Sequence, residues 1–449
     1  MSDAISLYTA LSGLQAARAR MEVASNNVAN VSTTGYTRQR ADLNPREHYQ
    51  ATYGFMGSGV TMSGVVRMRD SFLDSTFRSA SDLSGRSSIR AELLGRAETA
   101  LAEPDQGITG PLADLWSSFE DLASNPTNAG SRASVLGAID DVATRVREVA
   151  AGWDRLAGDA KLRMQDQLST VNDMLAQVAD LNRAIVEASG NPGAQPNDLL
   201  DRRDILIDSL ASSIGASAVT LADGTVKVSL DGVSLADGVT ATSLTLGSDG
   251  AVRTQSAIEL NLGGEIGGFH DFLVVDLPSL RANLDQLAED LAGALNTQHE
   301  AGWVSDTEAG GPLLSYTPGS AAASLKAVIT DPGKLALSGT QGPPFPAFDV
   351  DNMHALANLR TALAANGGTA TLAAAAGGIA VQLGSAAATS KRAADSQLSI
   401  ASAAEAARQS GHGVSLDEEM TELMSAQHAY EAAARVMTTV DQSLDTLIN

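Results

Sequence analysis

The 449-residue chain contains no cysteine, which excludes disulfide bonds, thiolate metal sites and a cysteine nucleophile. Aromatic residues are scarce as well, at 4% of the sequence, although 44% of the residues are hydrophobic. Much of this apolar content is alanine, so we expect thin cores, such as helix seams of small side chains, rather than one thick globule. The length alone suggests about two to four domains.

Basic residues are few, because 53 Asp and Glu oppose 30 Lys and Arg and give a net charge of -23. This balance argues against a general binder of nucleic acid or anionic membranes, since phosphate recognition needs Lys and Arg. The charge is uneven: residues 1–100 carry 11 basic and 9 acidic side chains, whereas residues 101–449 carry 19 and 44. A nearly neutral first segment suits burial against other subunits.

Long hydrophobic runs are absent too, since no stretch approaches the roughly 18 apolar residues of a transmembrane helix. The first twenty residues lack the basic start and the continuous apolar core of a secretory signal. The sequence therefore predicts no membrane insertion. Taken alone it also predicts a cytosolic chain, unless export uses a route without a cleaved signal.

Both ends of the chain carry residues spaced alternately three and four apart, which is the pattern of a helical heptad seam. The N-terminal stripe consists of Leu7, Leu11, Leu14, Arg18, Met21, Ser25 and Val28. The C-terminal stripe runs without a break through Leu423, Ala426, Tyr430, Ala433, Met437, Val440, Leu444 and Leu447. Ser415 and Glu418 have the spacing of a capping box, which indicates where the last helix begins.

Two interpretations of these stripes compete. A terminal amphipathic helix most often packs on the core of its own chain. Here, however, both stripes reach almost to the ends of the chain, where chains normally fray. We therefore predict that the terminal helices pair with each other and with neighbouring molecules in an assembly.

Residues 25–39, SNNVANVSTTGYTRQ, follow the N-terminal stripe. Asn and Thr favour caps and turns over helix interiors, so the first helix should end near Asn30. The run resembles the N-terminal signature of the bacterial flagellar axial proteins, a family that includes rod, hook and hook-associated proteins. The resemblance rests on Asn26, Asn27, Asn30, Gly35, Tyr36, Arg38 and Gln39. Its YTRQ ending favours the hook-associated branch.

Other parts of the chain resemble the same branch. Residues 413–449, GVSLDEEMTELMSAQHAYEAAARVMTTVDQSLDTLIN, are similar to its C-terminal signature, especially in LDEEM and AYEAAARV. Residues 115–136, 196–215 and 263–303 resemble its inner helical domain. The likeness thus covers both ends and most of the helical middle.

The middle of the chain combines helical and β patterns. Three stripes predict long helices packed side by side. They comprise Val135, Ile139, Val142, Val146 and Val149; Leu168, Val171, Leu175, Val178 and Ile185; and Leu280, Leu284, Leu287, Leu291 and Leu295. Residues 216–262 alternate between apolar and polar side chains around Asp-Gly pairs, which predicts β-hairpins. Residues 304–350 should form loops and short strands, and the Ala-rich residues 361–390 a mobile loop.

No pattern predicts catalysis, and no cofactor-binding or metal-binding residue is expected. The six histidines include no pair at metal-ligand spacing, and neither HExxH nor a phosphate-binding loop occurs. Residues 349–351 resemble the start of a calcium loop, but a helix N-cap explains them better. The acidic residues 417–419 suit a first helical turn, and residues 201–204 suggest a solvated charge cluster on a helix.

The sequence therefore predicts a mainly α fold with an inserted small β domain. In this fold the terminal helices pair as a coiled coil, and long helices form a bundle as the middle domain. The expected divisions are a terminal core of residues 1–70 and 395–449, a helical bundle of residues 71–215 and 263–394 with the loop-rich segment 304–350, and an inserted β-hairpin domain of residues 216–262.

The resemblance implies a structural component of the bacterial flagellum and not an enzyme. It implies a layer between hook and filament, built as a ring or helical layer by self-association through the paired terminal helices. The implied partners are the hook protein, a second junction protein (hook-associated protein 3) and a flagellar export chaperone on the C-terminal stripe, without nucleic acid.

The resemblance also implies type III export without a cleaved signal, so the expected location becomes extracellular rather than cytosolic. Two alternatives remain at this point. One is another flagellar axial protein, such as the hook protein or a distal rod protein. The other is a non-flagellar secreted adhesin with coiled-coil ends.

Overall fold

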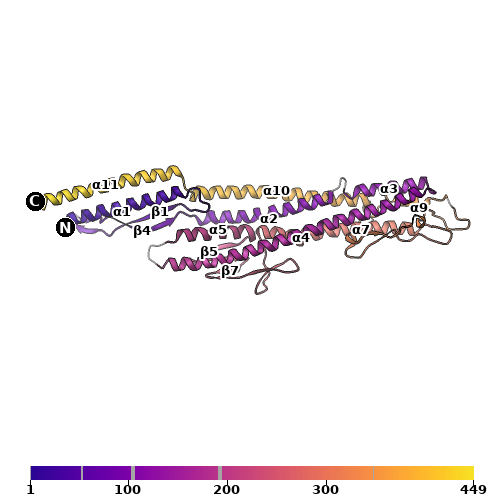
Figure 1. Ribbon diagram of the computed structural model, residues 1–449, viewed down its shortest axis with the longest axis horizontal. Coiled ribbons are helices and arrows are strands. Elements are labelled where there is room, and N and C mark those ends of the chain that lie inside the picture. Colours follow the sequence, from indigo (N-terminus) through magenta and orange to yellow (C-terminus); the bar gives the residue numbers. More distant parts are fainter. Residues whose placement is uncertain (1, 52–53, 103–106, 191–194, 347, 449) are drawn as a thin grey trace.

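The computed structural model describes residues 2–51, 54–102, 107–190, 195–346 and 348–448. They form an elongated molecule whose long helices run along its length, with both chain ends at the same tip (Figure 1). The fold is mainly α with small sheets, as the sequence predicts. We call the described parts of residues 2–70 and 413–448 the terminal unit and the remainder the bundle.

The terminal unit is built on two antiparallel helices, α1 (Ser2–Ala29) and α11 (Leu416–Ile448), which pack against each other (Figure 1). A β-ribbon packs on α1. Its strands are β1 (Gln39–Pro45), β2 (Tyr49–Ala51), β3 (Gly54–Met56) and β4 (Val60–Arg67), paired as β1 with β4 and β2 with β3. The end of α1 one residue before Asn30 confirms the helix boundary that the Asn-rich run predicts.

The bundle is dominated by helices that span much of its length. They are α2 (Ser71–Ala102), α4 (Ala129–Ala188), α5 (Asn197–Ile214), α6 (Gly264–Asp271), a π-helical turn (Phe272–Asp276), α7 (Leu277–Glu300) and α10 (Leu372–His412). At the end far from the chain termini, α3 (Thr109–Ser124) packs on α4 and on α9 (Asp351–Asn358) (Figure 1). The three stripes predicted in the middle of the chain are buried at every position, which confirms the bundle.

Few aromatic side chains fill the core, but those present lie at its centre. Trp116, Phe119 and Trp153 are fully buried with leucines and valines of the surrounding helices. The indole of Trp153 also donates a 3.0 Å hydrogen bond to the carbonyl oxygen of Ala97 on α2. This bond satisfies a polar group that would be costly to bury unpaired.

The alternating pattern of residues 216–262 predicts a small β region. This region packs on α4. One antiparallel sheet has the order β5 (Ser217–Thr220), β6 (Val226–Leu230), β7 (Val233–Asp237), β8 (Thr240–Ala241), and β9 (Leu244–Leu246) pairs with β10 (Val252–Thr254). The turns contain Asp-Gly pairs, and both Asp231 and Gly232 have positive φ angles, of 49° and 80°. Such angles are what a tight hairpin turn requires.

The loop-rich segment also agrees with its prediction. Its described residues form short elements, namely β11 (Leu314–Ser315), α8 (Ala321–Ser324), β12 (Lys326–Ala327) and a 3-10 turn (Pro332–Lys334). Within it, Asp349 accepts hydrogen bonds from the backbone N–H of Asp351 at the start of α9 and from Ser338. A helix thus begins before Met353, as predicted, but its N-cap residue is Val350, which makes no side-chain capping bond, and Asp349 acts one residue before it.

One prediction is wrong: most of the Ala-rich residues 361–390 belong to α10 and not to a mobile loop. The helix tolerates the pair Gly377-Gly378 because alanine has the highest helix propensity and surrounds them. Ile379 and Leu383 anchor it in the core. The helical span Leu372–Thr446 also has a window of mean hydropathy 1.4, long and apolar enough to cross a membrane by composition alone. Only 28% of this window is buried inside the structure.

The β region depends on one buried amide. The side chain of Asn182 donates to the carbonyl oxygens of Val226 and Gly238, and its oxygen accepts from Arg203. We predict that Asn182→Ala lowers the free energy of unfolding by about 3 kcal/mol, because it leaves these buried carbonyl and guanidinium groups without a hydrogen-bond partner. Urea denaturation measures the change, and the exposed Arg183→Ala is the control. A loss no larger than that of the control would contradict this role.

Candidate functional site: the paired terminal helices and their joint

Small side chains form the seam between α1 and α11. On α1, Ala10, Ala17 and Ala24 are buried, and they are spaced seven residues apart. A Cβ atom added at Gly13 would lie 3.8 Å from the Cβ of Ala433 on α11, so these residues face each other. Small residues let the two helices approach closely, which explains how a chain poor in aromatics makes this contact.

The larger side chains predicted to pack are arranged around this seam. On α1, Leu7, Leu11, Leu14, Met21 and Val28 are only partly buried, because each lies beside the alanines rather than among them. On α11, Ala426 is fully buried, and the partly buried residues are Leu423, Tyr430, Ala433, Met437, Val440 and Leu444. The side chain of Leu447 lies outside the described residues.

A buried polar network joins α1, the loop after it and the start of α11. The side chain of Asn27, only 1% exposed, donates to the backbone oxygen of Gln39 at 2.8 Å and to Glu419 Oε2 at 2.9 Å. Its oxygen accepts from Tyr36 Oη at 2.8 Å and from the Gln39 N–H at 3.0 Å. The amide of Asn27 thus connects two other members of the predicted family signature, Tyr36 and Gln39, with α11.

The charge of Glu419 is balanced within this network. Its carboxylate is 2% exposed and accepts from Arg38 Nε at 2.6 Å, while Arg38 Nη1 reaches Glu418 at 2.7 Å. Burial raises the pKa of Tyr36 to about 12, and the negative charges of Asp201 and Glu419 contribute. Tyr36 therefore remains a neutral hydrogen-bond donor at physiological pH.

The other signature residues shape the loop that carries the network. Asn30 Nδ2 donates to Asn26 Oδ1 at 2.7 Å, across the last turn of α1. Gly35 has a positive φ of 77°, and a Cβ atom there would collide with Ile205 on α5. The backbone conformation therefore favours glycine, and a larger residue would also have to displace the Ile205 side chain.

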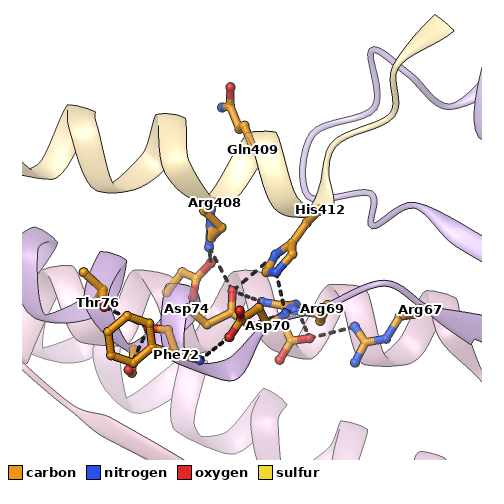
Figure 2. Close-up of polar contacts among 12 residues, drawn as sticks. Arg67, Arg69, Asp70, Phe72, Asp74, Thr76, Arg408, Gln409 and His412 are labelled. Atoms are coloured by element: carbon orange, nitrogen blue, oxygen red, sulfur yellow. Dashed lines mark hydrogen bonds and ion pairs between the residues drawn. The ribbon is translucent and has the colours of Figure 1, made fainter. Parts of the chain in front are cut away.

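A cluster of alternating charges, which we call the joint, attaches the terminal unit to the bundle. Arg67 Nη1 contacts Asp201 at 2.8 Å and Asp204 at 2.7 Å, and Arg69 Nη2 contacts Asp74 at 2.7 Å. Figure 2 shows Arg67, Arg69 and Asp74 lying below the end of α10. Each of these arginines has carboxylate partners, so a buried charge is not left unpaired.

The joint also includes residues of α10. The last of them lies where the chain turns from α10 toward α11. Arg408 Nη1 contacts Asp208 of α5 at 2.5 Å, and Arg408 Cζ lies 4.0 Å from the ring centre of Phe77. His412, the last residue of α10, accepts through Nε2 from the backbone N–H of Asp70 (Figure 2). Its carbonyl oxygen accepts from the Arg38 N–H at 3.1 Å. His412 therefore holds both strand ends of the ribbon against α10.

Burial lowers the pKa of His412 from its ordinary value, and the nearby charges of Arg69 and Arg408 lower it further. The negative charges of Asp74 and Asp70 act in the opposite direction. The lowered pKa favours the neutral ring, which is the form whose Nε2 can accept a hydrogen bond.

The sequence interpretation of residues 201–204 is wrong. Asp201 and Arg203 are buried rather than solvated, and Arg203 is 2% exposed. Burial lowers the pKa of Arg203 to about 10, although Asp204 acts in the opposite direction. The opposite charges at neighbouring positions indicate a network. Its partners, Thr37, Arg67, Arg69 and Arg78, are far away in sequence.

The joint borders a cleft of about 1030 Å³ between the loop after α1, the face of α5 and the end of α10. Its walls include Val31, Ile205 and Phe77 beside the paired charges of the joint. Among the described residues there is no group of three or more His, Asp or Glu that could hold a metal ion. The arrangement holds the terminal unit and the bundle together through paired charges.

Comparisons with known proteins agree with this arrangement. Residues 94–314 match the model of the flagellar hook-associated protein FlgK helical domain. Residues 7–37 match the flagella basal body rod protein model, and residues 407–449 match the flagellar basal body rod FlgEFG protein C-terminal model. The last two segments contain the signature loop and the start of α11.

Flagellar hook-associated protein 1 of Bacillus subtilis is 31% identical over an alignment covering 100% of this chain and 98% of that protein. The protein of the same name from Salmonella typhimurium is 29% identical over 68% of this chain and 58% of its own length. The solved flagellar hook junction protein FlgK from Burkholderia pseudomallei has the same fold over 76% of this chain and 100% of its own, with a TM-score of 0.67 at 16% identity.

The full-length similarity, the matching helical domain and the terminal signatures lead to one conclusion. The chain belongs to the flagellar hook-associated protein 1 family and is a structural component of the bacterial flagellum at the junction between hook and filament.

Proposed function

We propose that this protein performs its junction role by packing, with the α1–α11 pair in the inner wall of a tubular layer and the bundle outside it. The observation that carries this proposal is the incomplete burial of the pair. The seam consists of alanines, while the leucines of the N-terminal stripe stay partly exposed. Neighbouring copies that cover these leucines would supply the apolar burial that the pair lacks by itself.

The domain divisions predicted from the sequence fit this radial arrangement. Residues 1–70 and 395–449 would form the inner core, residues 71–215 and 263–394 the next layer, and residues 216–262 an outer β part. In the structure α10 passes residue 395 without a break, and the chain leaves the helix at Gly413. We therefore place the inner boundary at the joint.

We further propose partners on both sides of the layer. The hook protein would contact one face, and hook-associated protein 3 the other. Before assembly an export chaperone would cover the stripe on α11 from Leu423 to Leu447, and the chain would leave the cell through type III export without a cleaved signal. Even when α11 is paired with α1, it has exposed apolar residues that a chaperone would cover. This exposure supports chaperone binding before assembly.

Catalysis is not part of the proposed function. The acidic side chains gathered at the joint, such as Asp201, Asp204 and Asp208, contact arginines at 2.5–2.8 Å. Each of these carboxylates is thus occupied by an arginine partner. The joint therefore supports a mechanical role.

The first prediction concerns the seam. Tyr430→Glu or Leu444→Glu should block assembly of the junction, because each places a charge on the partly buried side of α11 while the bundle remains folded. Electron microscopy of cells and immunoblotting of the medium for shed filament protein measure the effect. Thr439→Glu, on an exposed position of the same helix, is the matched control. Normal filaments on cells with the Tyr430 variant would refute the proposal.

The second prediction concerns the isolated monomer. With no neighbour to cover its apolar residues, the α1–α11 pair should open more often than the bundle. Limited proteolysis should therefore trim both ends at once and leave a core that begins near Ser71 and ends within α10. Mass spectrometry identifies the cleavage sites. Termini that resist digestion in a chain shown to be monomeric would contradict this prediction.

The third prediction concerns the joint. Because the pKa of His412 is lowered in the folded state, its contribution to stability is complete above about pH 6.5 and decreases as the pH falls below that value. Hydrogen exchange of the Asp70 N–H should accelerate as the pH falls from 7 to 5, after correction for intrinsic exchange. His412→Gln should remove this dependence, whereas the exposed His428→Gln should not. An unchanged profile in His412→Gln would exclude His412 as the titrating group.

A further inference from the structure

The two sides of the α1–α11 pair are unlike each other. On one side the β-ribbon covers α1, where Ser12 Oγ accepts from the backbone N–H of Val60 at 3.2 Å. Leu14 follows Ser12 by two residues, so it lies about 200° around the helix and faces away from the ribbon. No described part of the chain covers that second side to the extent that the ribbon covers the first.

An apolar stripe continues along this second side on both helices. Leu14 and Met21 each follow a residue that faces α11, and Met420 follows Glu419, which faces α1. One residue corresponds to a rotation of about 100°, in the same sense along each helix. Because the helices are antiparallel, equal rotations bring these residues to the same side of the pair. Met420 and Met424 there are 48% and 51% exposed.

The outer surface of the ribbon is also apolar. Phe55 is 72% exposed, Met56 is 50% exposed and Met62 is 42% exposed. The only ring contact of Phe55 among the described residues is with His48 of the same hairpin. Hydrophobic side chains exposed together on a short ribbon are typical of an interaction surface.

The charges on the two surfaces are complementary. Asp417 and Glu431 continue the spacing of Met420 and Met424, so they flank the methionines on one face of α11. The ribbon carries Arg40 and Arg46. In the part of the chain that the structure describes, none of these four charged groups forms an ion pair within its own molecule.

We propose that the ribbon of one copy docks on the Leu14–Met21–Met420–Met424 face of the next copy, with Arg40 and Arg46 opposite Asp417 and Glu431. This inference rests on the proposed packing function and names the surfaces that carry it. Two different surfaces on opposite sides of one unit associate head to tail, and repetition of such a contact produces a ring or a helical layer. The partner is therefore a second copy of this chain.

Disulfide cross-linking tests this interface cleanly, because the natural chain contains no cysteine. Met62→Cys is combined in three double variants with Leu14→Cys, Met21→Cys or Met424→Cys. Hook–junction particles purified from cells that express each variant are oxidised, and the products are separated by non-reducing electrophoresis. We expect a ladder of covalent multimers for at least one pair, and the pair that reacts reports the axial offset between neighbours.

The matched control combines Met62→Cys with Val436→Cys. Val436 is 50% exposed, as Met424 is, but it lies on the other side of α11. A ladder in any test pair and not in the control supports the interface. Ladders in none of the three test pairs, or in the control equally, overturn it. If the particles contain the protein but show no ladder, only the proposed interface is excluded. If the parent chain is absent from the purified particles, the proposed packing function is excluded as well.

A charge exchange gives an independent measurement that does not require cysteine. Arg46→Glu should reduce the amount of protein in purified particles at least tenfold, and Glu431→Arg should do the same. The double variant should recover more than either single variant. Circular dichroism of the purified monomers shows whether each variant keeps the helix content of the parent. Equal loss in the double variant and both single variants, with unchanged helix content, would contradict the proposed pairing.

Discussion

The terminal unit depends on one buried carboxylate. Glu419 lies at the start of α11 with 2% of its surface exposed, and it is held by Asn27 of α1 and Arg38 of the following loop. A buried charge without partners costs several kcal/mol, so the two helices are held in the one register that supplies both partners. An alanine seam could not set that register, because neighbouring small residues are nearly interchangeable. The polar network thus fixes the register of α1 against α11, and the small residues allow the two helices to pack closely.

The joint repeats this principle between the terminal unit and the bundle. Arg67, Arg69 and Arg408 contact carboxylates on α2 and α5 at 2.5–2.8 Å. The ion pairs of the joint depend on the geometry of their partners and bury little surface. The bundle, in contrast, is held by a broad apolar core. The two parts of the molecule are therefore fixed relative to each other by specific contacts between charged groups.

Much of the fold could be predicted from the sequence because repeated apolar spacing marks helices directly. The stripe at Val135–Val149 is buried throughout, and the Asp-Gly pairs lie in turns of the β region. The prediction for residues 361–390 was wrong because glycine pairs dominated the interpretation, whereas alanine propensity and packing on α2 decide the outcome.

The site was less predictable. The signature residues could be listed from their resemblance, but which of them meet could not, because Asn27 and Glu419 are separated by 392 positions. On α1 the sequence drew attention to the large residues, Leu7 to Val28, whereas side-chain size selects the alanines for the intramolecular seam. The joint gave no periodic signal at all, since its charges come from four separate segments.

The placement of both chain ends at one tip has a consequence for the order of folding (Figure 1). Arg20 contacts Glu422 at 2.6 Å across 402 positions of sequence, so α1 packs only on the β-ribbon that follows it until almost the whole chain is present. Contacts of such high sequence separation form late, because a long loop must close first. A prematurely terminated chain would lack α11 and could not complete the inner unit. Pairing of the ends therefore requires a chain that extends into α11.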